Sequence, residues 1–395
     1  MDRLQNPYAP GAGVPPPALT GRQDEIDAFA TVLQRLKAGR PENSLILYGL
    51  RGVGKTVLLR RLQGLAEKEK WQTLTLEARA GMDFQQALAR GLYLGMRRLE
   101  GLGDTMKEAL GGVYRALASF ELRYSDNGWS LGLAAKPQSA LADSGDLEAD
   151  LTDLLITAAD AAKEADSGLA LFVDEMQLMP RDAVEALVSA FHEASQRTLP
   201  LCLAGAGLPQ LPGVIVNAKT YAERLFSYRK IDSLSETAAR DALRLPAEKE
   251  GIAIEPAALE AIAQRAGRYP YFLQVYGKHA WDAAPRSPIT LADIDAVTPD
   301  VIAELDEGFF YARWEKATQK EREYMSAMAL GGDSAQQTRD IAERMGRQPS
   351  DVSVQRDSLI KKGLIYASDH GLVDFTAPLF ADYIRRTHPQ PRPRR

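Results

Sequence analysis

The chain has 395 residues, of which 45% are hydrophobic and 26% are charged, and its formal net charge is −5. This length exceeds one hydrophobic core and predicts two or three domains, and the negative balance excludes nucleic-acid binding through a globally basic surface. The single cysteine, Cys202, excludes an internal disulfide, and four histidines without paired cysteines argue against a structural zinc site.

Residues 1–18 are rich in proline, glycine and alanine, and we expect them to lie extended on the surface of the adjoining domain. They lack the apolar core of a signal peptide, and no run reaches the roughly 18 apolar residues that span a bilayer. We therefore expect a cytoplasmic protein with no membrane partner. Thr20 is the expected N-cap of a helix over 22–36 that carries an apolar stripe.

The stretch from Ser44 to Leu59 reads SLILYGLRGVGKTVLL and places a glycine-rich loop between a buried strand and a helix. The loop has the pattern GxxxxGKT, in which glycines let successive N–H groups point at one anion beside a helix N-terminus. Lys55 would reach the β- and γ-phosphates, and the Thr56 hydroxyl would hold Mg²⁺. The sequence therefore predicts that ATP and Mg²⁺ bind here. The expected contacts are Gly49, Leu50, Arg51, Gly52, Val53, Gly54, Lys55, Thr56 and Val57.

A strand over 71–78 and a helix over 84–99 are expected next. The following carboxylate strand comes late, because Lys55 and Asp174 are 119 positions apart, whereas two βα units need only about 60 residues. We therefore expect an insertion over about 100–150.

Within this insertion the residues Asp126-Asn127-Gly128 are a strong turn signal. They separate 120–124 from 129–134, and the pattern predicts a β-hairpin there. A polar loop over 136–145 and a helix over 147–165 complete the insertion.

A second buried strand, over 168–177, ends in Asp174 and Glu175. Such a strand delivers Asp174 beside the glycine-rich loop, where its carboxylate can hold Mg²⁺. Glu175 would stand beside the γ-phosphate and activate the attacking water. A helix over 181–196 and a third apolar strand over 199–205 come next.

After Ile231 the pattern becomes helical, and a lid of helices is expected to reach about residue 305. Its expected helices cover 235–245, 256–266 and 271–283. Three helices and two strands then have the order of a winged helix, and they are expected over 320–330, 334–345, 349–362, 364–367 and 372–375. The basic tail 388–395 is expected to be disordered.

Several segments occur in an order that resembles AAA+ ATPases of the replication-initiator-like clade and the related STAND ATPases. They are GRQDEI at 21–26, the glycine-rich loop, the Asp174-Glu175 strand, GAGLP at 205–209 and GRYP at 267–270. The resemblance implies an α/β P-loop AAA+ parallel sheet with helices on both faces, an all-helical lid and a winged helix. The corresponding domains are 1–235, 236–305 and 306–387.

The resemblance also implies roles outside the glycine-rich loop. Leu19, Thr20 and Gly21 match the segment that packs on the adenine base. Arg224 matches an arginine finger that acts on the γ-phosphate of a neighbouring subunit in a self-assembly; a surface salt bridge with Glu223 or Asp232 is the alternative. Arg268 matches the lid's sensor arginine, and Pro270 would fix the turn into the next helix.

One departure from the family concerns the strand that ends near Ala204-Gly205-Ala206, where a polar residue usually contacts the γ-phosphate or the attacking water. Without such a donor, hydrolysis is expected to be slow or to need a partner. The preferred interpretation is an ATP-hydrolysing switch. The alternative is a DNA-binding initiator or regulator in which ATP only sets the conformation.

The third helix of the winged helix offers side chains suited to phosphates and base edges. The candidates for duplex DNA are Arg347, Gln348, Ser353, Arg356, Lys361 and Lys362. Residues 318–387, however, carry ten Lys and Arg against ten Asp and Glu, whereas DNA-binding domains usually have a basic face. A protein partner for the winged helix therefore remains an open alternative.

Overall fold

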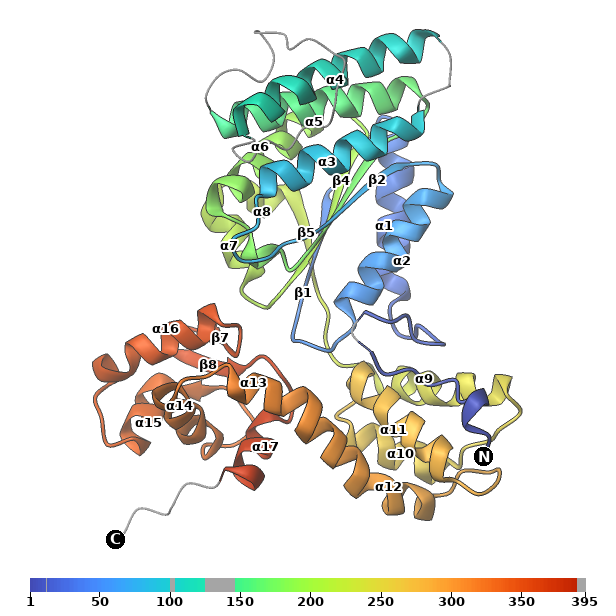
Figure 1. Cartoon of the computed structure of the whole chain (residues 1–395), viewed down its shortest axis with the longest axis vertical. Coiled ribbons are helices and arrows are strands. Elements are labelled where there is room, and N and C mark those ends of the chain that lie inside the picture. The colour runs from blue at the N-terminus through green and yellow to red at the C-terminus, as the bar shows by residue number, and fades with distance from the viewer. Residues whose placement is uncertain (12, 100–103, 125–145, 389–395) are drawn as a thin grey trace.

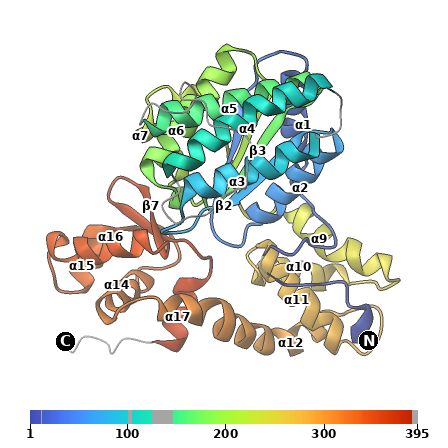
Figure 2. The same cartoon turned by 45° about the horizontal axis from the view of Figure 1, so that its top comes forward.

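The computed structural model describes residues 1–11, 13–99, 104–124 and 146–388. Figure 1 shows an α/β part at the top, with a helical region and a C-terminal region both on the side where the glycine-rich loop lies. The turned view in Figure 2 keeps both regions on that same side. No helix in the described part of the chain is long and apolar enough to cross a membrane.

The α/β part is built on one parallel sheet with the strand order β2-β3-β4-β1-β5. Its strands are β1 Ser44–Tyr48, β2 Gln72–Glu77, β3 Leu169–Asp174, β4 Leu201–Gly207 and β5 Phe226–Lys230. The central strands are continuous apolar runs because helices cover both faces of the sheet. Strand β4 lies between β1 and β3, so the ends of these two strands face each other across its end.

Helices α1 Gln23–Lys37 and α2 Lys55–Lys68 cover one face of the sheet. The other face is covered by helices that form a core with Leu74, Leu171 and Leu203. They are α3 Phe84–Met96, α4 Asp104–Tyr124, α5 Leu147–Glu164 and α6 Arg181–Gln196, with the short α7 Leu211–Ala218 and α8 Ala222–Leu225 beside them. Figure 1 shows α4 as an outer layer on α5.

The predicted β-hairpin in the insertion is wrong in its first strand, because residues 120–124 are the last turn of α4. Leu110, Val113, Leu117 and Phe120 are buried, and their spacing of three to four residues matches one face of a helix. This helical period outweighs the local turn signal. The expected turn and second strand, and the polar loop, lie in 125–145, outside the described residues.

The helical region contains one helix more than the three expected from the sequence. Its helices are α9 Glu236–Lys249, α10 Pro256–Arg265, α11 Pro270–Ala283 and α12 Leu291–Glu304. The extra helix, α12, begins with a capping box in which Thr290 and Asp293 satisfy each other's backbone N–H groups. A π-helical stretch, Leu305–Phe310, joins α12 to α13 Tyr311–Glu315, and Figure 1 shows this connection between the two regions.

The C-terminal region follows α13 and includes a three-stranded antiparallel sheet with the order β6-β8-β7. Its elements are α14 Gln319–Ala329, β6 Gln336–Gln337, α15 Thr338–Arg344, α16 Ser353–Lys361, β7 Ile365–Asp369, β8 Leu372–Phe375 and α17 Phe380–Thr387. The first residue of the expected tail, His388, stacks on Trp314 with ring centroids 4.2 Å apart. Residues 389–395 lie outside the described chain.

The N-terminal segment packs on the helical region. The Met1 ammonium donates to the carbonyl of Ala284 at 2.7 Å, and the Tyr8 hydroxyl donates to the carbonyl of Leu243 at 2.5 Å. The Tyr8 ring lies on Gly277 of α11, where an added Cβ would come within 2.7 Å of the ring. Burial raises the pKa of the Tyr8 phenol above its ordinary value.

The Gly277→Ala substitution tests this contact. We expect the added methyl group to cost about 1–3 kcal/mol of unfolding free energy through overpacking against Tyr8. In a Tyr8→Ala background the same substitution should be neutral or stabilising by up to about 1 kcal/mol, because alanine favours helix over glycine. Denaturant unfolding of the four proteins measures both effects, and an equal cost in both backgrounds would contradict the packing.

Candidate nucleotide-binding site

The glycine-rich loop connects the end of β1 to the first residue of α2 and presents free backbone N–H groups. Gly52 and Gly54 have φ of +85° and +89°, which side chains with a Cβ rarely adopt. In the described part of the chain, no acceptor is found for the N–H groups of Gly52, Val53 and Gly54. Three free donors beside a helix N-terminus form a site that suits an anion such as phosphate.

Lys55 is buried and folds back over the loop. Its ammonium donates to the carbonyls of Gly49 at 2.9 Å and Leu50 at 2.7 Å. Burial lowers its pKa to about 8, and the nearby charges of Glu175 and Asp174 offset only part of that effect. A buried cation held mainly by neutral carbonyls is electrostatically under-compensated, so an anion entering the loop would be strongly attracted.

Thr56 and Asp174 meet at the other side of the loop. The Thr56 hydroxyl donates to Asp174 Oδ2 at 2.6 Å, because β3 delivers the carboxylate to the same edge of the sheet at which β1 ends. A hydroxyl and a carboxylate side by side are the hard oxygen donors that Mg²⁺ prefers, so these two residues fit the predicted metal site.

Glu175 is held on both carboxylate oxygens. Its backbone has φ of +50°, and its N–H donates to Asp174 Oδ1 at 2.8 Å. Oε1 lies 3.3 Å from a guanidinium nitrogen of Arg51, and Oε2 accepts a hydrogen bond from the amide of Gln177. The sequence predicts only a phosphate contact for Arg51 and no role for Gln177, so both contacts with Glu175 are findings of the structure.

Strand β4 extends to Gly207, one residue beyond the expected tip. The tip has no side-chain donor, as the sequence indicates, but the space there is filled. Gln177 Oε1 accepts from the N–H of Leu208 at 3.0 Å, and a Cβ added to Gly207 would collide with this oxygen. A polar group from the turn after β3 therefore stands where β4 itself offers none.

The segment before α1 packs on the helical region. The Thr20 hydroxyl donates to the carbonyl of Ala238 at 2.7 Å, so Thr20 is not the N-cap of α1; that position belongs to Arg22. Leu19 is partly buried and Gly21 is exposed. These three residues lie at the junction of the α/β part and α9.

Arg22 is a structural link that the sequence did not single out. Its guanidinium donates to the carbonyls of Asp232 at 2.6 Å and Val53 at 3.1 Å. Burial lowers the pKa of Arg22 below its ordinary value, and the nearby charges of Glu25 and Asp232 offset only part of this effect. One side chain thereby ties the glycine-rich loop to the start of the helical region.

Comparisons with known proteins agree with this geometry. Residues 18–204 match the family model described as the AAA ATPase domain. A Walker-type ATPase of Pyrococcus abyssi is 15% identical and aligns with a TM-score of 0.55 over 93% of this chain and 96% of its own. The chain has an AAA+ P-loop fold.

Two further solved structures align over most of this chain. The RuvB Holliday junction branch migration motor of Thermotoga maritima is 15% identical, with a TM-score of 0.45 over 90% of this chain and 92% of its own. Cdc6p from Pyrobaculum aerophilum is 14% identical, with a TM-score of 0.48 over 98% and 96%. Residues 307–384 match a domain of unknown function, DUF8462. A search among curated protein sequences gives no match.

Arg268 and Pro270 lie where the helical region approaches the glycine-rich loop. Arg268 has φ of +58°, its carbonyl accepts from the N–H of Leu234 at 3.0 Å, and its side chain is exposed. No hydrogen bond or ion pair of its guanidinium occurs among the described residues. Pro270 is the first residue of α11, which begins one residue before the expected start of this helix.

Arg224 lies at the end of the sheet where the parallel strands begin, whereas the glycine-rich loop lies at the end where they finish. It precedes β5, whose first residue Phe226 pairs with Ser44 at the start of β1. Neither alternative salt bridge of Arg224, with Glu223 or with Asp232, occurs among the described residues, and Asp232 pairs with Lys230 at 2.7 Å. Arg224 is exposed and cannot reach the nucleotide site of its own chain.

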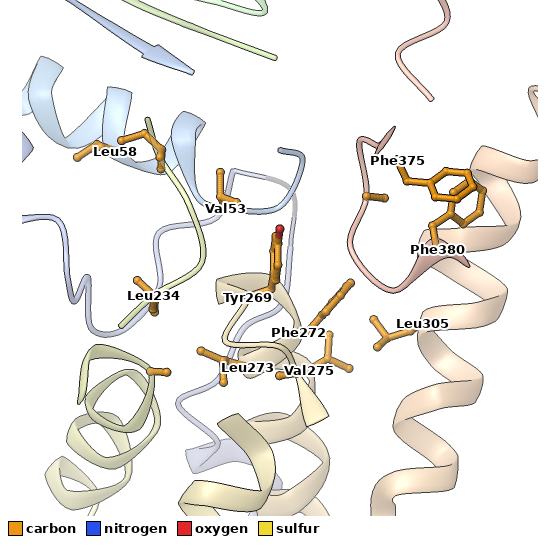
Figure 3. Close-up of a cluster of buried hydrophobic side chains, with 14 of the residues drawn as sticks. Val53, Leu58, Leu234, Tyr269, Phe272, Leu273, Val275, Leu305, Phe375 and Phe380 are labelled. Carbon is orange, nitrogen blue, oxygen red and sulfur yellow. The ribbon is translucent and has the colours of Figure 1, made fainter. Parts of the chain in front are cut away.

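The C-terminal region contacts the glycine-rich loop directly. The N–H of Arg51 donates to the carbonyl of Thr376 at 3.0 Å. A Cβ added to Gly363 would lie 3.1 Å from the Arg51 guanidinium and 3.2 Å from Leu208. Figure 3 shows the apolar side chains around this junction, with Tyr269 directed toward the part of the loop that carries Val53.

Three of the six DNA candidates are engaged by carboxylates. Lys362 donates to Glu321 at 2.6 Å, Arg356 lies 3.2 Å from Asp357, and Arg347 lies 3.6 Å from Glu323. Glu321 is buried, which raises its pKa, but hydrogen bonds led by that from Lys362 outweigh this effect and lower it to about 2. The other candidates, Gln348, Ser353 and Lys361, are exposed.

The low pKa of Lys55 predicts a pH dependence of ATP binding. Between about 8 and the ordinary value of 10.5, the folded protein carries less charge on Lys55 than the unfolded chain, so the ligand-free protein gains stability as pH rises through this window. Bound phosphate favours the charged form, so ATP binding should take up a proton there and weaken as pH rises.

Calorimetry of ATP binding at pH 8.5 in buffers of different ionisation enthalpy measures this proton uptake. Lys55→Arg is the matched control because arginine stays charged, and any ATP binding by this variant should proceed without the uptake assigned to Lys55. Equal proton uptake in both proteins would contradict the assignment.

Proposed function

We propose that the protein is an ATP-binding, ATP-hydrolysing molecular switch of the AAA+ class. The observation that carries this proposal is the convergence of Lys55, the Thr56–Asp174 pair and Glu175 at one edge of the sheet. The matches to an AAA ATPase domain and to a Walker-type ATPase fold support it.

In the proposed mechanism, Lys55 and the free N–H groups of the loop bind the phosphates of ATP. Thr56 and Asp174 would hold Mg²⁺, which would supply positive charge to offset that of the phosphate oxygens. Glu175 accepts a proton from a water molecule that attacks the γ-phosphorus, and the bond to the ADP oxygen breaks. Leu19, Thr20 and Gly21 would contact the base.

Two arginines complete the proposed cycle. Arg268 would turn toward the phosphates and transmit their presence to the helical region. Its side chain is exposed and therefore free to turn. Arg224 would act as an arginine finger in a neighbouring copy, because its place at the far edge of the sheet excludes action in its own chain.

A second candidate function is a regulator that binds ATP with negligible turnover, and that acts as an initiator on DNA through its C-terminal region. It is favoured by the lack of a polar side chain at the end of β4. The proposed winged helix, with the order α14, α15, α16, β7 and β8, would contact duplex DNA or a protein partner in either case.

Two substitutions separate binding from hydrolysis. Lys55→Ala should abolish ATP binding or weaken it strongly, whereas Lys68→Ala, an exposed lysine at the far end of the same helix, should bind normally. Glu175→Gln should retain ATP but lose roughly 10²- to 10⁴-fold in turnover, as expected for removal of a general base.

Steady-state turnover is measured with and without duplex DNA, with Glu175→Gln as the blank. Turnover stimulated by DNA would support a DNA-coupled switch, and turnover indifferent to DNA would favour a protein partner. Bound ATP without turnover would establish the second candidate in place of the first. Unchanged ATP affinity in Lys55→Ala would refute the site itself.

We further propose that nucleotide state is coupled to the C-terminal region through Arg51. The carbonyl of Thr376 accepts from the N–H of Arg51, and bound phosphate would compete for this N–H, so ATP should loosen the contact between the loop and 363–376. Hydrogen exchange of 363–376 should therefore accelerate when a non-hydrolysable ATP analogue binds, and not in Lys55→Ala. Unchanged exchange with the analogue bound would contradict this coupling.

A further inference from the structure

We propose that Gln177 is a positioning residue for Glu175 and takes the place of the polar side chain that β4 lacks at its end. This inference rests on the proposed ATP hydrolysis. It adds a role for a residue that the mechanism proposed above does not include. Gln177 lies in the 3-10 turn Met176–Leu178, of which Glu175 is the N-cap, directly after β3.

The hydrogen bonds fix the orientation of the Gln177 amide. A backbone N–H can only donate, so the amide oxygen must face Leu208, from which it accepts at 3.0 Å. The amide NH₂ then faces Glu175 and donates to Oε2. One side chain therefore joins the end of β4 to the carboxylate, with a single arrangement of donor and acceptor.

The local packing shows that Gln177 and a side chain on β4 exclude each other. A Cβ at Gly207 would collide with the amide oxygen of Gln177. A Cβ at Gly205 would come within 2.8 Å of the sulfur of Met176, in the same turn. The glycines in the Gly-Ala-Gly end of β4 therefore leave room for the turn after β3 to pack against this strand. The Gln177 amide occupies that room.

The two contacts of Glu175 differ in how easily a nucleotide would disturb them. Arg51 and Glu175 are both about a third exposed and 3.3 Å apart, so their attraction is weakened by solvent. Anionic phosphate oxygens would compete for the Arg51 guanidinium and free Oε1 of Glu175. Gln177 is neutral and would keep its bond to Oε2.

The freed oxygen is then the one that accepts the proton from water, while the other oxygen stays fixed to Gln177. A base held in one orientation lowers the barrier of the chemical step, and a small misplacement costs up to about 100-fold. We therefore expect loss of Gln177 to lower kcat by roughly 10- to 100-fold and to leave the KM and Kd for ATP nearly unchanged.

Two variants separate positioning from a purely structural role. Gln177→Glu keeps an oxygen that accepts from Leu208 but replaces the donor facing Glu175 by a like charge. Gln177→Met removes both bonds and keeps the side-chain length. If Gln177 positions Glu175, both variants lose kcat; if it only fixes the end of β4, Gln177→Glu retains kcat and Gln177→Met alone loses it.

The experiment measures kcat, KM and ATP affinity of the full chain for both variants, with thermal unfolding to confirm that each is folded. Gln196→Glu is the matched control, because it makes the same chemical change on an exposed residue at the end of α6. Wild-type kcat in folded Gln177→Glu overturns the inference, as does a folded Gln177→Met with unchanged kcat.

The outcome is distinguishable from failure of the proposed function. If wild type hydrolyses ATP and Glu175→Gln does not, the function stands, and the Gln177 variants decide the inference alone. If Glu175→Gln retains wild-type turnover, the role of Glu175 fails and the inference falls with it. If Gln177→Glu fails to fold, Gln177→Met still tests the inference, because wild-type kcat in the folded Gln177→Met protein would overturn it.

Discussion

The site depends on one constraint: a parallel sheet covered on both faces has its backbone polar groups committed to the strand ladder, and its side chains are apolar. Polar side chains can meet only where the strands end. Because β4 separates β1 from β3, the glycine-rich loop and the Asp174-Glu175 pair face each other across the end of β4. The 2.6 Å bond between Thr56 and Asp174 is the direct sign of this convergence.

The two cations at this edge already have hydrogen-bond or ion-pair partners, but phosphate can displace these partners. Lys55 is held mainly by neutral carbonyls, and Arg51 by a partly exposed carboxylate. A polyanion makes stronger hydrogen bonds to Lys55 than neutral carbonyls do, and it would compete with the solvent-screened carboxylate of Glu175 for Arg51. Nucleotide binding would therefore rearrange existing contacts, and the release of Glu175 would follow from the movement of Arg51.

The glycine-rich loop is held by three sets of contacts with other parts of the molecule. A change in the loop on nucleotide binding would therefore be transmitted to those parts. Arg22 holds the carbonyl of Val53, and Thr376 holds the N–H of Arg51. Val53 also belongs to a continuous apolar core that extends through Phe272 to Phe380 in the C-terminal region, part of which Figure 3 shows. Close-packed cores switch between discrete arrangements, so a small shift of the loop has a route to the whole molecule.

Sequence alone indicated the AAA+ fold class, and it named the side chains that the structure brings together at the end of the sheet, Thr56, Asp174 and Glu175. The glycine pattern before Lys55 and the apolar strand before Asp174 are local signals, because a strand end and a loop carry their chemistry within a few residues. The strand expected at 120–124 was wrong for the same reason. It was inferred from a local turn signal, which could not show that Leu110, Val113 and Phe120 bury one face of a long helix on α5.

Tertiary structure alone decided which groups complete the site. Arg51 pairs with a carboxylate 124 positions away, Arg22 reaches Asp232, and Gln177 enters the space that Gly207 leaves. The lack of a polar residue at the tip of β4 is evident in the sequence, but the residue that fills its place comes from the turn after β3. Such contacts depend on strand order and on the shape of the packed edge, and neither is encoded in the spacing of any one segment.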